Sequence, residues 1–255
     1  MPFVNLDDCR IQYHVHGEPS PAPPLVLIHG AAGGQYVWLE QRHLAGRQVL
    51  TLDLPGHGGS SPQAAVAEIH HYAEVVAAFA AALGHERFVP VGHSMGGAIA
   101  LTLALQHSAR IPALVLLATG ARLPVSEFVF AAIDTSFDQL GELLAQTVYA
   151  PQTDPALVAR FTNGPLQVTR DQARADFEAC ARFDVRQRLG EITAPTLILA
   201  GAQDQLMGAG RIQQLASGIV GSQHRTLEDA GHMLMQERPA AVNEALHAFL
   251  DELTF

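Results

Sequence analysis

Residues 88–97 read FVPVGHSMGG and lead into an apolar, alanine-rich run over residues 98–105. An apolar run that ends in glycine, exposes one residue and meets glycine again before a helical pattern is typical of a strand that turns sharply into a helix. Glycine is needed at Gly92 and Gly96 because the backbone on either side of the serine passes too close for a Cβ atom. The stretch therefore predicts a strained turn that holds Ser94 at the carboxyl edge of a sheet.

A nucleophile in this turn would have a backbone donor beside it. The amide of Met95 would point at whatever Ser94 attacks, and the dipole of the following helix would help to stabilise an oxyanion. The pattern Gly-x-Ser-x-Gly also occurs by chance, with the serine acting as a helix cap. The strand, turn and helix around Ser94 favour the nucleophile.

Composition excludes several classes of partner. The chain has 255 residues, 48% of them hydrophobic, with 15 basic and 25 acidic side chains and a formal net charge of −10. This is enough for one large α/β domain, and the acidic balance argues against nucleic acid or an anionic membrane as partner. The start lacks the features of a secretory signal, and no apolar run approaches the roughly 20 residues of a membrane span. We expect a soluble, cytoplasmic protein.

The two cysteines, Cys9 and Cys180, lie far apart in the sequence. Two distant cysteines are no disulfide framework, and cysteine most often behaves as a small buried apolar residue. The sequence also shows no cluster of histidines and carboxylates with the spacing of metal ligands. We therefore predict neither a metal nor another cofactor.

Strand-like and helical patterns alternate along most of the chain. Strand-like runs cover residues 9–16, 25–28, 48–52, 88–93, 113–117, 196–200 and 224–227, with helical patterns at 36–45, 68–83 and 240–250. The alternation predicts a mostly parallel sheet with helices on both faces.

The alternation breaks between residues 120 and 189, where we find only helical patterns, at 125–133, 137–147, 156–161 and 168–183. We interpret residues 121–188 as a helical cap, or lid, inserted into a core domain formed by residues 1–120 and 189–255. Loops at this edge of a sheet often carry function. A plain packing layer with no role in substrate choice remains the alternative.

A serine hydroxyl needs a base in contact with it and an acid that orients the base. Asp204 follows the strand-like run at 196–200, and His232 follows the last strand-like run. An isolated aspartate is often a turn residue and an isolated histidine often structural, but the order Ser, Asp, His is that of an α/β hydrolase. We predict that Ser94, Asp204 and His232 form a catalytic triad.

An oxyanion hole needs a second donor besides the amide of Met95. The loop HGAAGG at residues 29–34 consists of small residues that let the backbone approach a substrate oxygen. We predict that the amide of Ala31 is this donor and that His29 is structural.

Five blocks in this order resemble the α/β-hydrolase-fold superfamily, in its group of serine esterases, C–C hydrolases and lactonases. The blocks are His29-Gly30 with Trp38 nine positions after His29, DLPGHGGS at 53–60, GHSMGG at 92–97, Gly201-x-x-Asp204 and Gly231-His232. The resemblance implies an α/β-hydrolase fold with about eight strands and a structural role for residues 53–60. It excludes haloalkane dehalogenases and epoxide hydrolases, which place an aspartate at the position of Ser94.

Six residues near these blocks are candidates for substrate binding: Ala32, His93, Trp38, Phe128, Met207 and Met233. Methionine fills irregular core space as readily as a pocket, so for the methionines and aromatic residues both interpretations stay open. C–C hydrolases usually carry asparagine where this chain has His93.

The resemblance implies a serine hydrolase that cleaves small to medium carboxylic esters through an acyl-enzyme, as a monomer or homodimer. Two alternatives stay open. One is a lactone or C–C bond hydrolase acting on a small carboxylic acid, with Arg122, Arg174 or Arg182 as carboxylate anchor. The other is a ligand-binding protein without turnover on the same scaffold, because fold alone does not settle function.

Overall fold

The computed structural model describes residues 2–44, 46–62, 68–162 and 166–255. Its described part contains a sheet of eight strands in the order β1-β2-β4-β3-β5-β6-β7-β8. The strands are β1 (Phe3–Asn5), β2 (Arg10–His16), β3 (Leu25–Ile28), β4 (Val49–Leu52), β5 (Val89–His93), β6 (Leu114–Leu117), β7 (Thr196–Gly201) and β8 (Gln223–Leu227). Strand β2 pairs antiparallel with β1 and β4, and all other pairs are parallel. The predicted mostly parallel α/β sheet is confirmed.

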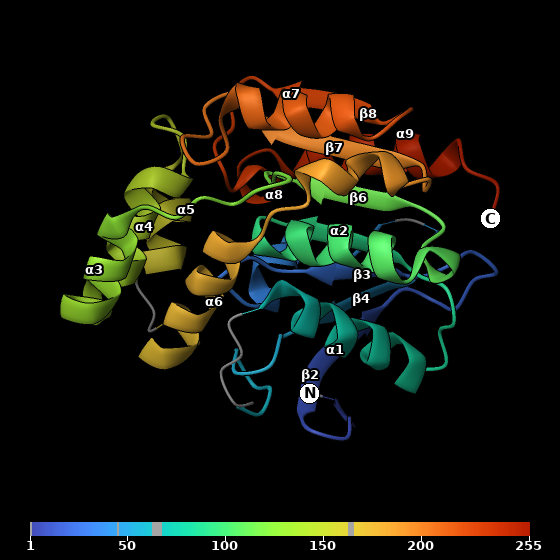
Figure 1. Ribbon diagram of the computed structural model, residues 1–255, viewed down its shortest axis with the longest axis horizontal. Helices are drawn as coiled ribbons and strands as arrows, with labels where there is room; N and C mark the ends of the chain where they lie inside the picture. Colours follow the sequence, from blue (N-terminus) through green and yellow to red (C-terminus); the bar gives the residue numbers. More distant parts are fainter. Residues whose placement is uncertain (1, 45, 63–67, 163–165) are drawn as a thin grey trace.

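Helices cover both faces of this sheet (Figure 1). They are α1 (Ile69–Ala82), α2 (Met95–Gln106), α3 (Glu127–Thr135), α4 (Leu140–Val148), α5 (Pro155–Thr162), α6 (Arg170–Arg182), α7 (Gly208–Gly218), α8 (Leu234–Glu237) and α9 (Pro239–Asp251). Short 3-10 helices are η1 (Gln35–Gln41), η2 (Ser108–Arg110), η3 (Phe137–Gln139) and η4 (Arg186–Glu191). None of the described helices is long and apolar enough to cross a bilayer.

The central strands β3 to β7 are buried on both faces, so their side chains divide between two cores. In β6, Leu114 and Leu116 pack into the core that α1, α2 and α7 cover, whereas Val115 and Leu117 face the core beneath η1, α8 and α9. Successive side chains of a strand point to opposite faces, which is why the run LVLL reads as continuously apolar.

Helices α3 to α6 lie between β6 and β7 in the sequence and gather at one side of the sheet, on the left of Figure 1. Their bounds agree closely with the helical patterns predicted for residues 125–183. An isolated bridge between His57 and Val168 joins this helical insertion to the loop after β4.

The turn at Ser94 has the predicted strain. Ser94 adopts φ 53° and ψ −116°, in a region that non-glycine residues rarely occupy. A Cβ atom at Gly92 would collide with the carbonyl of Gly96, and one at Gly96 would collide with the carbonyl of Ile28. Neither glycine can therefore be replaced by a larger residue while β3, β5 and α2 stay this close.

Several elements differ from the sequence-based expectation. The helix expected over residues 36–45 is the 3-10 helix η1, kinked at Trp38, and residue 45 lies outside the described residues. Strand β1 and helix α7 were not predicted. Helix α7 is flanked by glycines that indicate a loop, although Ile212 and Leu215 are buried at helical spacing.

We expect Gly96→Ala to destabilise the protein by about 3 kcal/mol or more, because the new methyl group meets backbone that cannot move aside. The matched control is Gly210→Ala in α7, where a Cβ atom meets nothing within 4 Å and a helical alanine adds roughly 0.5–1 kcal/mol of stability. Urea unfolding of both variants measures the difference. Equal stabilities would contradict the close approach at Gly96.

Candidate active site

Three strand ends bring the candidate catalytic side chains to one edge of the sheet. Ser94 follows β5, Asp204 follows β7 and His232 follows β8, and these parallel strands end on the same side. The Nδ1–H of His232 donates to Oδ2 of Asp204 at 2.9 Å, and both residues are buried, at 3% and 7% exposure.

Both oxygens of the Asp204 carboxylate accept hydrogen bonds. Its Oδ1 accepts the amides of Leu206 at 2.8 Å and Met207 at 3.0 Å. Burial alone would raise the pKa of Asp204, but the neighbouring His232 and these hydrogen bonds outweigh it, so its pKa is lowered. Asp204 is therefore ionised at neutral pH and orients the imidazole of His232.

Ser94 and His232 line the same small cavity, of about 70 Å³, at the edge of the sheet. Ala31, His93 and Met233 also line it. The half-buried Ser94 thus faces a space bounded by the imidazole on one side and by the loop after β3 on the other.

His93 joins the serine turn to the histidine loop. Its Nε2–H donates to the carbonyl of His232 at 3.0 Å, and the two rings lie 4.8 Å apart. Burial, with a contribution from His232, lowers the pKa of His93 to about 3, so this ring is neutral. The amide of His232 donates to the carbonyl of Val148 at the end of α4. The backbone of His232 is therefore fixed from both β5 and the helical insertion.

The loop after β3 lies directly against Ser94. A Cβ atom at Gly30 would be 3.1 Å from the Cβ of Ser94. His29 holds this loop, because its Nδ1–H donates to the carbonyl of Gly30 at 2.8 Å and its Nε2 accepts the amide of Leu54 at 3.0 Å. Burial and the nearby His57 lower the pKa of His29 to about 4, consistent with a neutral structural ring.

A fully buried ion pair lies behind this loop, between His57 in the loop after β4 and Asp176 in α6. His57 Nε2 donates to Oδ2 of Asp176 at 2.7 Å, and Nδ1 donates to the carbonyl of Pro55 at 3.0 Å. Both partners only accept, so both ring nitrogens carry protons. Burial alone would lower the pKa of His57 and raise that of Asp176, but their mutual attraction reverses both directions.

A second, larger cavity of about 410 Å³ opens beside Ser94, mostly between the helical insertion and the loop that leads into α7. Ala31 and Ser94 belong to its wall, together with apolar side chains such as Leu144 and Phe177. Phe177 and Leu144 line both cavities, so the two spaces meet at Ser94.

The structure divides the candidates for substrate binding. Phe128 and Met207 line the larger cavity, and His93 and Met233 line the smaller one. The other two lie elsewhere: Trp38 is fully buried in the core edge-to-face with His93, and Ala32 donates its amide to Asp176.

None of the three arginines expected as carboxylate anchors is among the residues that line these two cavities. Arg174 pairs with Asp134 and Glu178 at the surface, and Arg182 also pairs with Glu178. Arg211 on α7 lines the larger cavity instead, and its Nη1 donates to the carbonyls of Leu206 and Met207. Sequence reasoning missed Arg211 because it missed α7.

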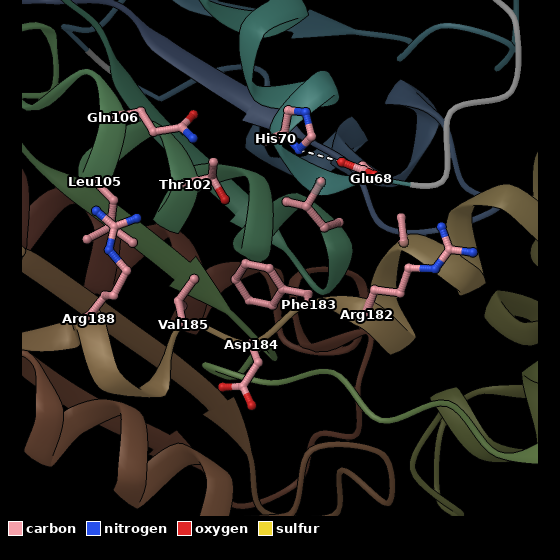
Figure 2. Close-up of a pocket in the computed structure, with 12 residues that line it drawn as sticks. Glu68, His70, Thr102, Leu105, Gln106, Arg182, Phe183, Asp184, Val185 and Arg188 are labelled. Atoms are coloured by element: carbon pink, nitrogen blue, oxygen red, sulfur yellow. Dashed lines mark ion pairs between the residues drawn. The ribbon is translucent and has the colours of Figure 1, made fainter.

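Another hollow, of about 280 Å³, lies away from Ser94 between the start of α1, helix α2 and the segment after α6 (Figure 2). Its charged side chains are largely paired with neighbours. His70 pairs with Glu68, and Arg188 pairs with Glu191. The described residues that line it include no serine or cysteine.

Within the described residues, no group of three or more histidines, cysteines or carboxylates is placed to hold a metal ion. Cys9 and Cys180 are both buried and unpaired with each other, and burial raises the pKa of each thiol.

A family model described as the alpha/beta hydrolase fold matches residues 23–239. Monoacylglycerol lipase abhd6-B of Xenopus laevis is 27% identical over 281 residues, covering 98% of this chain and 82% of the lipase. The 2-hydroxy-6-oxononadienedioate/2-hydroxy-6-oxononatrienedioate hydrolase of Cupriavidus pinatubonensis is 28% identical over 97% of this chain and 94% of its own. The enol-lactonase structure from Burkholderia xenovorans LB400 has a TM-score of 0.91 at 24% identity, covering 98% of this chain and all of that one.

The pair of His57 and Asp176 should make stability depend on pH. His57 has a raised pKa in the folded protein, so its contribution is complete below the unfolded value of about 6.5 and is lost as pH rises through the folded pKa. The contribution of Asp176, whose pKa is lowered, is present above about pH 4 and is lost in acid.

We expect the stability advantage of the wild type over His57→Gln to shrink above about pH 6.5, by up to about 1.4 kcal/mol per pH unit. Urea unfolding across the pH range measures it, with the exposed His224→Gln as control. An advantage that stays constant with pH would show that His57 is not protonated in the folded protein.

Proposed function

The chain belongs to the alpha/beta hydrolase fold family, and from that premise we propose that it is a serine hydrolase of small to medium carboxylic esters. The observation that carries the proposal is the arrangement at the sheet edge. Ser94 in its strained turn shares a cavity with His232, whose Nδ1–H is held by Asp204 at 2.9 Å. A serine hydroxyl becomes reactive when a histidine that an aspartate orients in this way takes its proton.

In the proposed reaction, Ser94 Oγ attacks the acyl carbon and its proton passes to Nε2 of His232. Asp204 holds the tautomer with a proton on Nδ1 and stabilises the imidazolium that forms. The carbonyl electrons move to oxygen, and the amides of Ala31 and Met95 receive this oxyanion. Met95 is the first residue of α2, so its N–H has no partner inside the helix. Each such donor lowers the barrier by about 3 kcal/mol.

The tetrahedral intermediate then collapses to an acyl-enzyme. His232 gives its proton to the leaving alcohol, and a water that enters takes its place. His232 removes a proton from that water, which attacks the acyl carbon of the ester on Ser94. The second collapse releases the carboxylic acid and returns the proton to Ser94.

The larger cavity supports a substrate with an apolar acyl or alcohol group. Its wall is predominantly aliphatic and aromatic, and burial of each methylene there favours binding by about 0.8 kcal/mol. Phe128, Leu144 and Phe177 come from the helical insertion, which supports the assignment of residues 121–188 as a cap that shapes the site. The relative named as a monoacylglycerol lipase supports the same class of ester.

Hydrolysis of a lactone or a C–C bond in a small carboxylic acid is the second candidate. It is favoured by Arg211, which lines the larger cavity and could receive a substrate carboxylate, and by the relative whose name specifies a dienedioate. A panel of neutral esters, enol lactones and dienoic keto acids separates the two. Faster turnover of the acids than of any ester would replace the ester proposal.

We expect hydrolysis of p-nitrophenyl esters, with kcat/KM rising from acetate toward medium acyl chains as the apolar cavity fills. Ser94→Ala should lower kcat/KM by about 10⁴-fold or more, because it removes the nucleophile. The control is Ser217→Ala on α7, whose hydroxyl bonds only to the carbonyl of Gln214 at the surface. A fluorophosphonate should label Ser94 in the wild type, as measured by peptide mass.

Absence of both turnover and labelling would contradict the proposal. That result would favour a ligand-binding protein on a hydrolase scaffold.

A further inference from the structure

The carboxylate of Asp176 is a fully buried junction between the helical insertion and the core. Its Oδ2 accepts the amide of Ala32 at 2.9 Å and Nε2 of His57 at 2.7 Å. Its Oδ1 accepts the hydroxyl of Tyr72 at 2.7 Å and Nε2 of Gln172 at 3.0 Å. All four hydrogen bonds converge on one side chain of α6, and one of them reaches the residue next to Ala31.

We propose that Asp176 is a positioning residue that sets the direction of the Ala31 amide toward the oxyanion. The inference rests on the proposed serine hydrolase function and names a residue that the triad and the oxyanion hole do not include. Asp176 acts on the reaction only through the loop after β3.

Two peptide planes meet at Ala31. In each plane, the polar atom of the neighbouring residue is held by hydrogen bonds. The plane between Gly30 and Ala31 is held through the Gly30 carbonyl, which accepts Nδ1 of His29 and the amide of Gly33. The plane between Ala31 and Ala32 is held through the Ala32 amide, by Asp176. The Ala31 N–H lies in the first of these planes, and the Cα of Ala31 joins that plane to the second, so the direction of the N–H depends on both anchors.

The backbone at Ala32 needs such an anchor. Ala32 has φ 51°, in the left-handed region that disfavours a residue with a Cβ atom. Strained conformations persist only where the surrounding structure holds them. Without the bond to Asp176, the peptide between Ala31 and Ala32 can rotate toward an unstrained conformation, and this shifts the Cα of Ala31 together with the amide attached to it.

Only a carboxylate satisfies all four donors. An asparagine amide presents one oxygen and one NH₂ group, so either Ala32 and His57 or Tyr72 and Gln172 would meet a donor instead of an acceptor. Asp176→Asn is nearly isosteric and therefore tests the hydrogen-bond acceptor with little change in volume.

We expect Asp176→Asn to lower kcat for a p-nitrophenyl ester about 10- to 100-fold while KM changes less than about threefold. Inhibition by a trifluoromethyl ketone, whose hemiketal with Ser94 carries an oxyanion, should weaken by a similar factor. Inhibition by the carboxylic acid product, which forms no hemiketal, should not change. The matched control is Asp171→Asn, an exposed carboxylate in the first turn of the same helix.

A merely structural role would move both inhibitors together or leave kcat within about twofold of the wild type. Either result overturns the inference. If Asp176→Asn does not fold, Asp176→Glu keeps the charge beside His57 and displaces the oxygens by one methylene. It should lower kcat in the same way, and a wild-type kcat in this variant would again overturn the inference.

The two proposals fail in different ways. A wild type that shows neither turnover nor labelling of Ser94 overturns the proposed function and this inference with it. An active wild type whose Asp176 variants keep full kcat overturns only the role of Asp176.

Discussion

The close approach of β3, β5 and the start of α2 is the constraint on which the rest of the site depends. The carbonyl of Ile28 lies where a side chain at Gly96 would be, and the carbonyl of Gly96 lies where a side chain at Gly92 would be. The chain can leave β5 in so little space only through the strained backbone of Ser94. This geometry places Ser94 at the edge of the sheet, beside the loop after β3 and the first amide of α2.

The helical insertion forms hydrogen bonds with the loops at this edge of the sheet and lines both cavities there. The end of α4 accepts the amide of His232, α6 holds the amide of Ala32, and Phe177 lines both cavities. A change in the insertion can therefore reach His232, the loop after β3 and both cavities beside Ser94. The buried ion pair of His57 and Asp176 is one of the contacts that join the insertion to the core.

Much of the fold could be predicted from the sequence because parallel strands are buried on both faces and so form continuous apolar runs, such as LVLI at 25–28. Ser94 and Asp204 are candidates because they follow such buried strands, β5 and β7. Helix α7 was missed because Gly208, Gly210 and Gly218 resemble a loop, and Arg211 was missed with it. For Trp38 the sequence left a pocket wall and the core equally open, since hydrophobicity alone does not separate them, and the structure places Trp38 in the core.

The pairing of His57 with Asp176 joins residues 119 positions apart, and no local pattern indicates it. The resemblance implied only that residues 53–60 are structural. Which partner satisfies His57 depends on how α6 packs against the core, and this is visible only in the folded chain.

The central claim is that one hydroxyl attacks a substrate carbonyl carbon, one imidazole takes the proton of that hydroxyl, and two backbone amides hold the carbonyl oxygen. A crystal structure of the protein inactivated by an alkyl phosphonate tests it most directly. We predict a bond from Ser94 Oγ to phosphorus, with the phosphonyl oxygen about 3 Å from the amides of Ala31 and Met95. An adduct on another residue, or a phosphonyl oxygen directed away from both amides, would contradict this account.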